Sequence, residues 1–387
     1  MTTFSSTNIL EINHLSVEYA SASGAVRALN DVSIVLERGQ ILGLAGESGS
    51  GKTTLGHAVS RLLRPPALIT AGEVLYYPAA DVSHTTRHET VQPERKAGQP
   101  IDVLKLGARE LRAVRWSTLA IVFQSAMNAL NPVLRLSSQI DDVLRAHRPQ
   151  MTAQERRERA QELLRLVGIS PDRIKSYPHE LSGGMRQRAI IAIALALSPE
   201  IIIMDEPTTA LDVVVQREIL MEIARLRERF NFSVIFITHD LSLLLELADK
   251  IAIMYAGRIV ETATCAELKR QPRHPYSYGM LNSFPTLHGP RRRMTGIPGS
   301  PPDLREVPAG CPFHPRCPMA FAPCATTLPK VRASSAETPH QLVACHLYDP
   351  AHRAGPLPTN AEFGARYEEV YAQSSFRQAR AMGEGAR

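Results

Sequence analysis

The stretch Ile41–Thr54, ILGLAGESGSGKTT, decides the fold of this chain of 387 residues. Its first five residues, Ile41–Ala45, are apolar, as in a short buried strand, and Lys52 opens a helical pattern that runs to Leu63. Between them lies a loop of the form G-x-x-x-x-G-K-[ST]. A strand, this loop and a helix in that order predict a phosphate-binding loop for a nucleoside triphosphate.

We expect the residues of this loop to bind the phosphates of ATP. Lys52 is expected to reach the β- and γ-phosphates, and the Thr53 hydroxyl is expected to ligate Mg²⁺. The glycines allow the backbone to wrap the phosphates, and the helix N-terminus favours their negative charge. The other expected contacts are Gly46, Ser48, Gly49, Ser50, Gly51 and Thr54.

A second glycine-rich loop, Leu181–Arg188 (LSGGMRQR), lies about 130 residues further along and opens its own apolar helix. Ser182, Gly183 and Gly184 offer a hydroxyl and backbone N–H groups to phosphate oxygens. Two phosphate-binding loops so far apart cannot easily serve one nucleotide within one chain. The pattern therefore predicts an ATP-driven dimer in which two copies of such a domain hold each nucleotide between them.

Two carboxylates follow the apolar stretch Ile201–Met204, which reads as a buried strand. Asp205 is placed to hold Mg²⁺, directly or through water, and Glu206 to act as general base on the attacking water. An acidic pair at a strand end is common on its own. It gains its meaning here from the complete phosphate-binding loop upstream.

Two more polar side chains end apolar stretches, where α/β sheets place their sites. Gln124 follows Ile121–Phe123 and could contact the metal or the water, whereas alone it would read as a surface glutamine. His239 follows Val234–Thr238 and could hydrogen-bond the γ-phosphate, whereas alone it would read as a structural histidine. Their order and spacing favour the functional interpretation of both.

Strand patterns alternate with helical patterns, which predicts a mostly parallel α/β sheet. The remaining strand patterns are Ile9–Ile12, Val32–Leu36 and Ile251–Met254, and the remaining helical patterns are Ala153–Val167, Met185–Leu197 and Val213–Phe230. Residues 78–100 are polar and read as a surface insertion. We divide the chain into a nucleotide-binding domain (1–270) with a helical subdomain at about 105–198, a separate loop-rich region (271–350), and a loose tail (351–387) with one short helix.

Composition limits the alternatives. The net charge of +6 and the pI near 9.1 fit a solvated surface with a slight basic excess, although nucleic acid or an anionic membrane would also suit it. The longest apolar run, Ala189–Leu197, is too short to cross a bilayer, and the N-terminus lacks the pattern of a signal peptide. Any membrane role is therefore expected to be peripheral, and the five cysteines are expected to be thiols or metal ligands.

These motifs, in this order, resemble the ATPase subunit of an ATP-binding cassette (ABC) transporter. The resemblance implies a P-loop ABC-type domain with antiparallel β and helical subdomains, followed by a small Pro- and Cys-rich appendix. It further implies that Ser182–Gly184 contact the γ-phosphate of ATP held by the partner, that Asp212 couples the two sites, and that Asn128–Pro132 meet the membrane subunits. Tyr19 matches the aromatic residue that stacks on adenine, unless it is a core tyrosine of an edge strand.

The C-terminal region resembles the segment that follows the cassette in oligopeptide and dipeptide importer ATPases, a group that includes nickel and other small-solute systems. Arg273–Tyr276, Gly296–Pro302 and Gly310–Pro318 carry this resemblance. It implies uptake of peptides or a similar small solute. The implied partners are a second ATPase subunit, related or identical, two transmembrane permease subunits and, indirectly, a solute-binding protein. The implied place is the cytoplasmic face of the inner membrane, as a peripheral subunit.

Four cysteines of this region repeat the spacing of four cysteines in that family: Cys311, Cys317, Cys324 and Cys345. The resemblance implies a [4Fe–4S] cluster, which all-thiolate ligation suits. Zinc is an alternative, with His314 and His346 as adjacent ligands, but the spacing lacks the paired C-x₂-C of zinc ribbons. Ordinary reduced thiols are the third interpretation, and Cys265 reads as a plain thiol.

A rival from another class is a soluble ABC-type ATPase acting on nucleic acid. Such proteins usually carry two cassettes in one chain, or long coiled-coil or zinc insertions. This chain has one phosphate-binding loop, one Ser-Gly-Gly loop and neither insertion. A non-hydrolysing regulatory cassette is disfavoured because Asp205 and Glu206 are both intact.

Overall fold

The computed structural model describes residues 7–22, 24–78, 99–123, 129–209, 211–283, 296–353 and 355–384, with side chains as far as residue 372. Besides the end of the predicted tail, sequence predictions fall wholly or partly outside these ranges at three places. They are the insertion at 78–100, the role of Gln124, and the permease contact of Asn128–Pro132.

The centre of the molecule is a sheet in which β9 (Lys250–Tyr255), β3 (Ile41–Ala45), β8 (Ser233–Ile237), β7 (Ile201–Asp205) and β6 (Leu119–Val122) are adjacent and parallel, in that order. The predicted parallel α/β sheet is confirmed. Every residue of β3, β7 and β8 is buried, because layers cover both faces of the sheet.

One face of this sheet is covered by α1 (Lys52–Val59) and by a second sheet. That sheet has the antiparallel order β2-β1-β4-β5, formed by β1 (Asn8–Tyr19), β2 (Val26–Glu37), β4 (Ala67–Tyr76) and β5 (Ile101–Asp102). The strands predicted at Ile9–Ile12 and Val32–Leu36 are parts of β1 and β2, which are longer than their apolar segments. Half-exposed strands alternate polar and apolar residues, so their ends escape a search for apolar runs.

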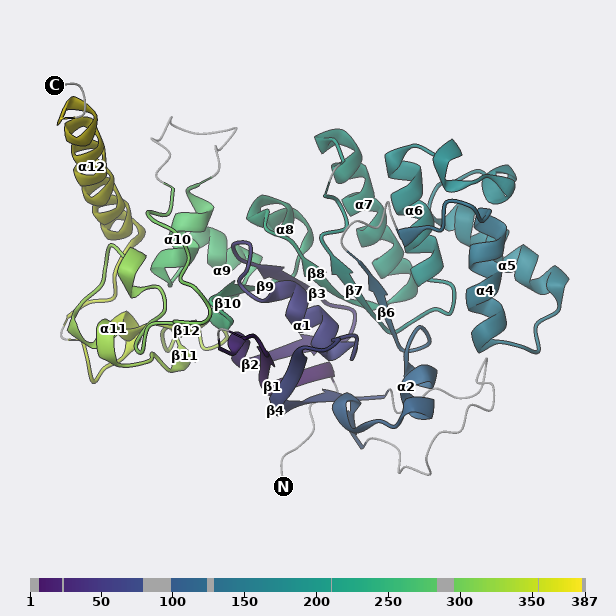
Figure 1. The fold of residues 1–387 in the computed structure, drawn as a ribbon, viewed down its shortest axis with the longest axis horizontal. Helices are drawn as coiled ribbons and strands as arrows, with labels where there is room; N and C mark the ends of the chain where they lie inside the picture. Colours follow the sequence, from purple (N-terminus) through teal and green to yellow (C-terminus); the bar gives the residue numbers. More distant parts are fainter. Residues whose placement is uncertain are drawn as a thin grey trace.

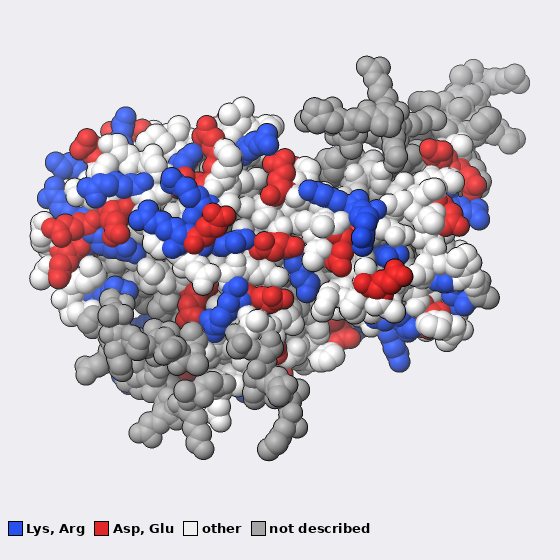
Figure 2. Space-filling model, turned by 180° about the vertical axis from the view of Figure 1, so that it is seen from behind, with Lys and Arg blue, Asp and Glu red and all other residues white. Residues whose placement is uncertain are grey.

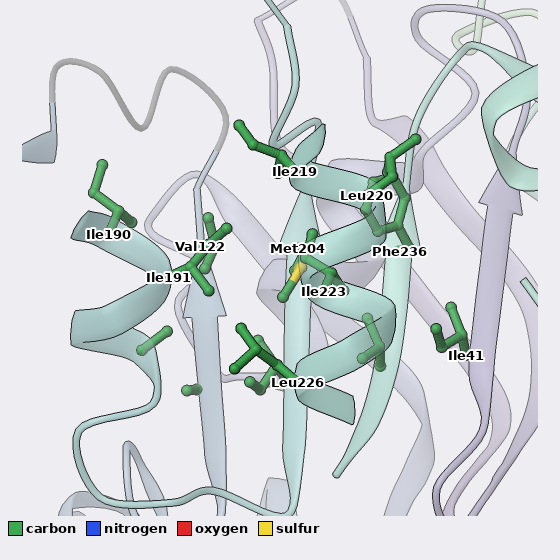
Figure 3. Close-up of a cluster of buried hydrophobic side chains, with 14 of the residues drawn as sticks. Ile41, Val122, Ile190, Ile191, Met204, Ile219, Leu220, Ile223, Leu226 and Phe236 are labelled. Carbon is green, nitrogen blue, oxygen red and sulfur yellow. The ribbon is translucent and has the colours of Figure 1, made fainter. Parts of the chain in front are cut away.

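The other face is covered by α6 (Gly183–Ala194) and α7 (Val213–Phe230). In Figure 3, Ile223 of α7 lies next to Met204 of β7, and Ile191 of α6 lies next to Val122 of β6. Side chains alternate across the strand, so Ile202 and Met204 join this cluster while Ile201 and Ile203 join the cluster under α1. The helix of the phosphate-binding loop and the helix of the Ser-Gly-Gly loop therefore lie on opposite faces of one sheet.

Helices gather beyond the β6 edge of the sheet (Figure 1). They are α4 (Leu136–His147) and α5 (Ala153–Leu166), which pack on α6 next to the sheet, whereas α2 (Ala108–Val114) lies apart from them, below β6 in the view of Figure 1. A capping box of Thr152 and Glu155 starts α5, since each side chain bonds the backbone N–H of the other residue. These helices occupy the segment predicted as a helical subdomain.

The C-terminal region lies at the opposite end of the molecule (Figure 1) and extends the central sheet. After α8 (Leu241–Leu247), β10 (Arg258–Thr264) pairs with β9 and also with β12 (Leu342–Ala344), which pairs with β11 (Val331–Ala333). Three short helices accompany these strands: α9 (Cys265–Arg270), α10 (Pro275–Leu281) and α11 (Ala322–Thr326). Through β10, the strands β12 and β11 join the central sheet across the boundary expected near residue 270.

The prediction of a loose tail with one short helix is wrong. Residues Asn360–Glu384 form a single helix of 25 residues, α12. Phe363 and Tyr367, one helical turn apart, are fully buried against Tyr278 of α10, and the Tyr367 hydroxyl donates to the carbonyl of Pro275 at 2.9 Å. That i, i+4 aromatic pair was the signal in the sequence. Across the described residues, none of the helices combines the length and apolar character that a bilayer crossing needs.

Candidate nucleotide-binding site

The phosphate-binding loop joins β3 to α1 in a conformation that glycine alone adopts without strain. Gly46 has φ 153° and Gly51 has φ 103°. A Cβ at Gly46 would lie 2.3 Å from the carbonyl oxygen of Met254, and one at Gly51 would lie 2.4 Å from that of Ala28. Both close approaches exclude side chains, so the loop is tied to β9 and β2 through its glycines.

Lys52 lies inside the curve of the loop, with only 5% of its surface exposed. Its Nζ donates to the carbonyl oxygens of Gly46 at 2.8 Å and of Glu47 at 3.0 Å. Burial lowers the pKa of Lys52, while Glu206, Asp205 and Glu47 act in the opposite sense. A buried ammonium group held by neutral carbonyls is a good counter-ion for an entering phosphate.

Thr53 and Asp205 meet at the start of α1 and the end of β7. The Thr53 hydroxyl donates to Asp205 Oδ1 at 3.2 Å. Burial raises the pKa of Asp205, which is 1% exposed, and the hydrogen bond from Thr53 opposes this shift. A hydroxyl and a buried carboxylate are hard oxygen donors of the kind that Mg²⁺ prefers, and a cation would also relieve the cost of burying the carboxylate.

Glu206 is held by the ends of two neighbouring strands. Its backbone has φ 45°, a strained conformation for a residue with a side chain, and its N–H donates to the carbonyl of Ile237 in β8 at 2.9 Å. Its carboxylate lies 3.1 Å from His239 Nδ1 and accepts a hydrogen bond from the Thr209 hydroxyl at 2.9 Å. The carboxylate is therefore oriented on both sides, as a general base requires.

Tyr19 lies at the end of β1, where its hydroxyl is 3.4 Å from that of Thr54. The ring also packs against the apolar cluster that contains α1. This placement puts the ring beside the phosphate-binding loop. Its stacking on adenine stays a prediction.

The Ser-Gly-Gly loop is not part of this cluster. Ser182 caps α6, since its hydroxyl accepts from the backbone N–H of Met185 at 3.2 Å, and it is exposed. Gly184 permits close packing on α7, because a Cβ there would lie 2.7 Å from Val215. Asp212 caps α7 through Val215 N–H at 3.0 Å and is also exposed. Ser182 and Asp212 are therefore both exposed to solvent, on the side of the sheet opposite to α1.

Three further residues support the site, and none of them carries a sequence motif that predicts this role: Thr209, Glu47 and Arg316. Thr209 orients Glu206, and its position three residues after the proposed base was the feature of the sequence that could have indicated this role. Glu47 received no role although it lies inside the loop. Arg316 of the C-terminal region pairs with Glu47, with nitrogen–oxygen distances of 2.6 and 3.0 Å. No periodic pattern connects those two positions.

The four C-terminal cysteines are free thiols that influence one another electrostatically. Burial raises the pKa of Cys311 to about 11, and it also raises the pKa values of Cys317, Cys324 and Cys345. Backbone N–H groups oppose this effect at each sulfur, for example those of Phe313 and His314 at Cys311. Cys311, Cys324 and Cys345 are buried and Cys317 is half-buried, and no three of these four described Sγ atoms lie within 4.8 Å of one another.

Cys265 stands apart, with its thiol donating to the carbonyl of Ala248 at 2.8 Å. The two histidines considered as zinc ligands differ. His314 Nδ1 is engaged by the carbonyl of Cys311 at 2.9 Å. His346 uses Nε2 to reach the carbonyl of Thr327 at 2.7 Å, and its ligand atom also lies within 4.8 Å of those of Asp349 and His352.

Comparison with known proteins adds the family context. Residues 29–209 match the family model described as "ABC transporter", and residues 260–324 match "Oligopeptide/dipeptide transporter, C-terminal region". The oligopeptide transport ATP-binding protein OppD of Bacillus subtilis is 41% identical over 79% of this chain and 80% of its own length. The dipeptide transport ATP-binding protein DppD of Lactococcus lactis is 41% identical over 81% and 84%.

OppD of Salmonella typhimurium is 40% identical over 87% of this chain and 93% of its own. Among solved structures, a dimer of the ATP-binding cassette MJ0796, in a post-hydrolysis state bound to ADP and Pi, superposes with a TM-score of 0.55. It is 26% identical and covers 66% of this chain and 99% of its own. The matched part is thus a whole cassette, and the C-terminal region lies beyond it.

Proposed function

Because this chain belongs to the ABC transporter family, within the group of oligopeptide and dipeptide transport ATP-binding proteins, we propose that its ATPase activity powers the uptake of di- or oligopeptides or a similar small solute. The observation that carries the catalytic part is the convergence of Lys52, Asp205 and Glu206. These residues come from the phosphate-binding loop and the end of β7, far apart in the chain, and meet at one edge of the sheet.

In this proposal Glu206 takes the proton of the attacking water. His239 and Thr209 orient its carboxylate for this role. Lys52 leaves its carbonyl partners for the β- and γ-phosphates as ATP enters. Thr53 and Asp205 would hold Mg²⁺, which offsets phosphate charge when it is bound. Gln124 is proposed to contact the metal or the water.

Each ATP is proposed to lie between two cassettes. Ser182–Gly184 serve the nucleotide of the partner subunit, because in their own chain α6 and α1 lie on opposite faces of the sheet. Asp212, exposed at the start of α7, is placed to couple the two sites. Closure on ATP and release after hydrolysis would switch the permeases between their two states of access. Asn128–Pro132 are the proposed permease contact, and the subunit is peripheral to the membrane on its cytoplasmic face.

The exchange Glu206→Gln in the assembled transporter tests the role of the base. The variant keeps a side chain of the same shape, so it should still bind ATP and accumulate as a closed dimer. Turnover should fall by at least about 100-fold, since general-base catalysis contributes roughly 10²–10⁴. Glu228→Gln, on the exposed side of α7, is the matched control. Near wild-type hydrolysis by the Glu206→Gln transporter would refute the assignment.

For the four cysteines we propose a metal–thiolate site, and a [4Fe–4S] cluster is the form that suits an all-thiolate set of four. Burial supports this proposal because a bound metal would replace the proton on thiols whose thiolates are otherwise costly to form. Anaerobic purification followed by visible absorption and metal analysis tests it. A brown, iron-containing protein is expected, zinc in stoichiometric amount would identify the alternative metal, and a colourless, metal-free protein would rule out both.

The face of the molecule shown in Figure 2 gives the nucleic-acid alternative no support. On the face shown in Figure 2, Lys and Arg side chains are interspersed with Asp and Glu. Mixed charges of this kind are typical of a solvated surface, whereas a phosphate backbone calls for a continuous basic stripe.

A further inference from the structure

The second residue of the phosphate-binding loop, Glu47, is held by the C-terminal region at two points. Its carboxylate accepts a two-pronged pair from Arg316, with Nη1–Oε2 at 2.6 Å and Nη2–Oε1 at 3.0 Å. Its backbone N–H donates to the hydroxyl of Tyr276 at 2.9 Å. Both partners lie more than 200 positions away, beyond the part of the chain that matches the ABC cassette.

Arg316 is fixed before it reaches Glu47. Its side chain is 6% exposed, its Nε donates to the carbonyl of Pro298 at 2.7 Å, and its Nη2 donates to that of Gly299 at 3.2 Å. The guanidinium also lies over the rings of Tyr255 and Phe313, with 5.8 and 6.0 Å to their centroids. Because these contacts fix the position of the guanidinium, they also fix the orientation of the carboxylate that forms a two-pronged pair with it.

Glu47 passes this constraint to the groups that bind phosphate. Its carbonyl oxygen accepts from Lys52 Nζ at 3.0 Å and from the backbone N–H of Ser50 at 3.2 Å. The side chain, the N–H and the carbonyl of this residue are therefore all engaged. The C-terminal region contacts the side chain and the N–H of Glu47, whereas the loop residues Lys52 and Ser50 contact its carbonyl oxygen.

The charges give the contact a second role. A carboxylate inside a phosphate-binding loop repels the triphosphate unless a cation neutralises it. Arg316 is the cation in contact with that carboxylate, and the hydrogen bond from Lys52 goes to the carbonyl of Glu47 instead. Without Arg316, the loop would keep only the hydrogen bond to Tyr276 as its anchor and would present an uncompensated negative charge near the ATP.

We propose that Arg316 is a positioning residue of the ATP site. It acts through Glu47, so that the cysteine-bearing region supports the conformation of the phosphate-binding loop. The inference rests on the proposed function and deepens it. Because Cys317 directly follows Arg316, the packing around the four thiols and the shape of the loop depend on the same short segment.

A double-mutant cycle on the full chain tests the proposal, with MgATP and MgADP as ligands. Arg316→Met should weaken binding of MgATP about tenfold, the lower end of what a lost charge-assisted pair costs. In the Glu47→Gln background the same exchange should weaken binding less than about threefold, because the carboxylate through which Arg316 acts is gone. In the assembled transporter, KM for ATP should rise about tenfold while kcat changes little.

Arg332→Met is the matched control, since Arg332 forms a partly buried pair with Asp349 in the same region at 2.7 Å. It should leave the affinity for MgATP unchanged. If Arg316→Met does not fold, Arg316→Lys, which keeps the charge and loses the two-pronged geometry, replaces it in the cycle. Equal effects of the Arg316 exchange in both backgrounds would overturn the proposal, and so would unchanged affinity with an intact fold. A wild-type chain that binds no MgATP would instead refute the proposed function.

Discussion

His274 is expected to make the protein less stable in mild acid. The residue is 1% exposed and caps α10, where its Nδ1 accepts the backbone N–H of Tyr276 at 3.0 Å. The neutral ring must therefore carry its proton on Nε2. A second proton would have to enter at Nδ1 and would displace the cap.

Burial lowers the pKa of His274 to about 3, from an ordinary value of 6.5. The unfolded chain thus takes up a proton at higher pH than the folded chain does. The stability that depends on the neutral ring is complete above about pH 6.5 and is lost as the pH falls from there towards about 3. Each pH unit inside this window costs about 1.4 kcal/mol, so the loss between pH 7.5 and pH 5 is about 2 kcal/mol.

The comparison of wild type with His274→Asn isolates this contribution. Asparagine keeps an acceptor for the cap and does not titrate, so the variant should lose about 2 kcal/mol less than wild type between pH 7.5 and pH 5. Urea unfolding followed by fluorescence of the single tryptophan, Trp116, measures both free energies. Other titrating groups, including the buried Glu261 whose carboxylate accepts from the His274 N–H, act in both proteins and cancel in the difference. The same acid loss in the two proteins would refute the reasoning.

Two further exchanges test the loop and the core. Gly51→Ala should reduce the affinity for MgATP at least tenfold, because backbone strain of about 1–3 kcal/mol at φ 103° adds to the collision of the new Cβ with the Ala28 carbonyl oxygen. Gly24→Ala is the control: Gly24 has φ 115° but open space around it, so the affinity should stay unchanged. Equal binding by the two variants would contradict the account of the loop. Ile223→Ala, at a fully buried position of α7, should lower the free energy of unfolding by about 2–5 kcal/mol in urea unfolding. Met221→Ala, on the same helix but 59% exposed, should lower it by less than about 0.5 kcal/mol.

The central sheet could be predicted because its strands are buried on both faces and are therefore continuous apolar runs. The same property places polar residues at the ends of those runs, which is why Asp205, Glu206 and His239 could be named together. The structure brings these three to one edge of the sheet. The ends of β1 and β2 and the length of α12 escaped prediction, because their buried residues are separated by polar ones and take part in contacts that only the folded chain provides.

The contact between Arg316 and Glu47 differs from these features because no local sequence pattern accompanies it. Strand ends and loop glycines leave a local pattern because the backbone near them must take a particular shape. A pair of charges 269 positions apart leaves none, since either residue alone is compatible with an exposed surface. What fixes the pair is the packing of Tyr255, Tyr276 and Phe313, whose ring centroids lie 4.7 to 5.3 Å apart beside the guanidinium. The aromatic cluster thus holds Arg316 in the position from which it supports the ATP site. Substitutions of these aromatic residues should therefore alter the affinity for ATP by displacing Arg316.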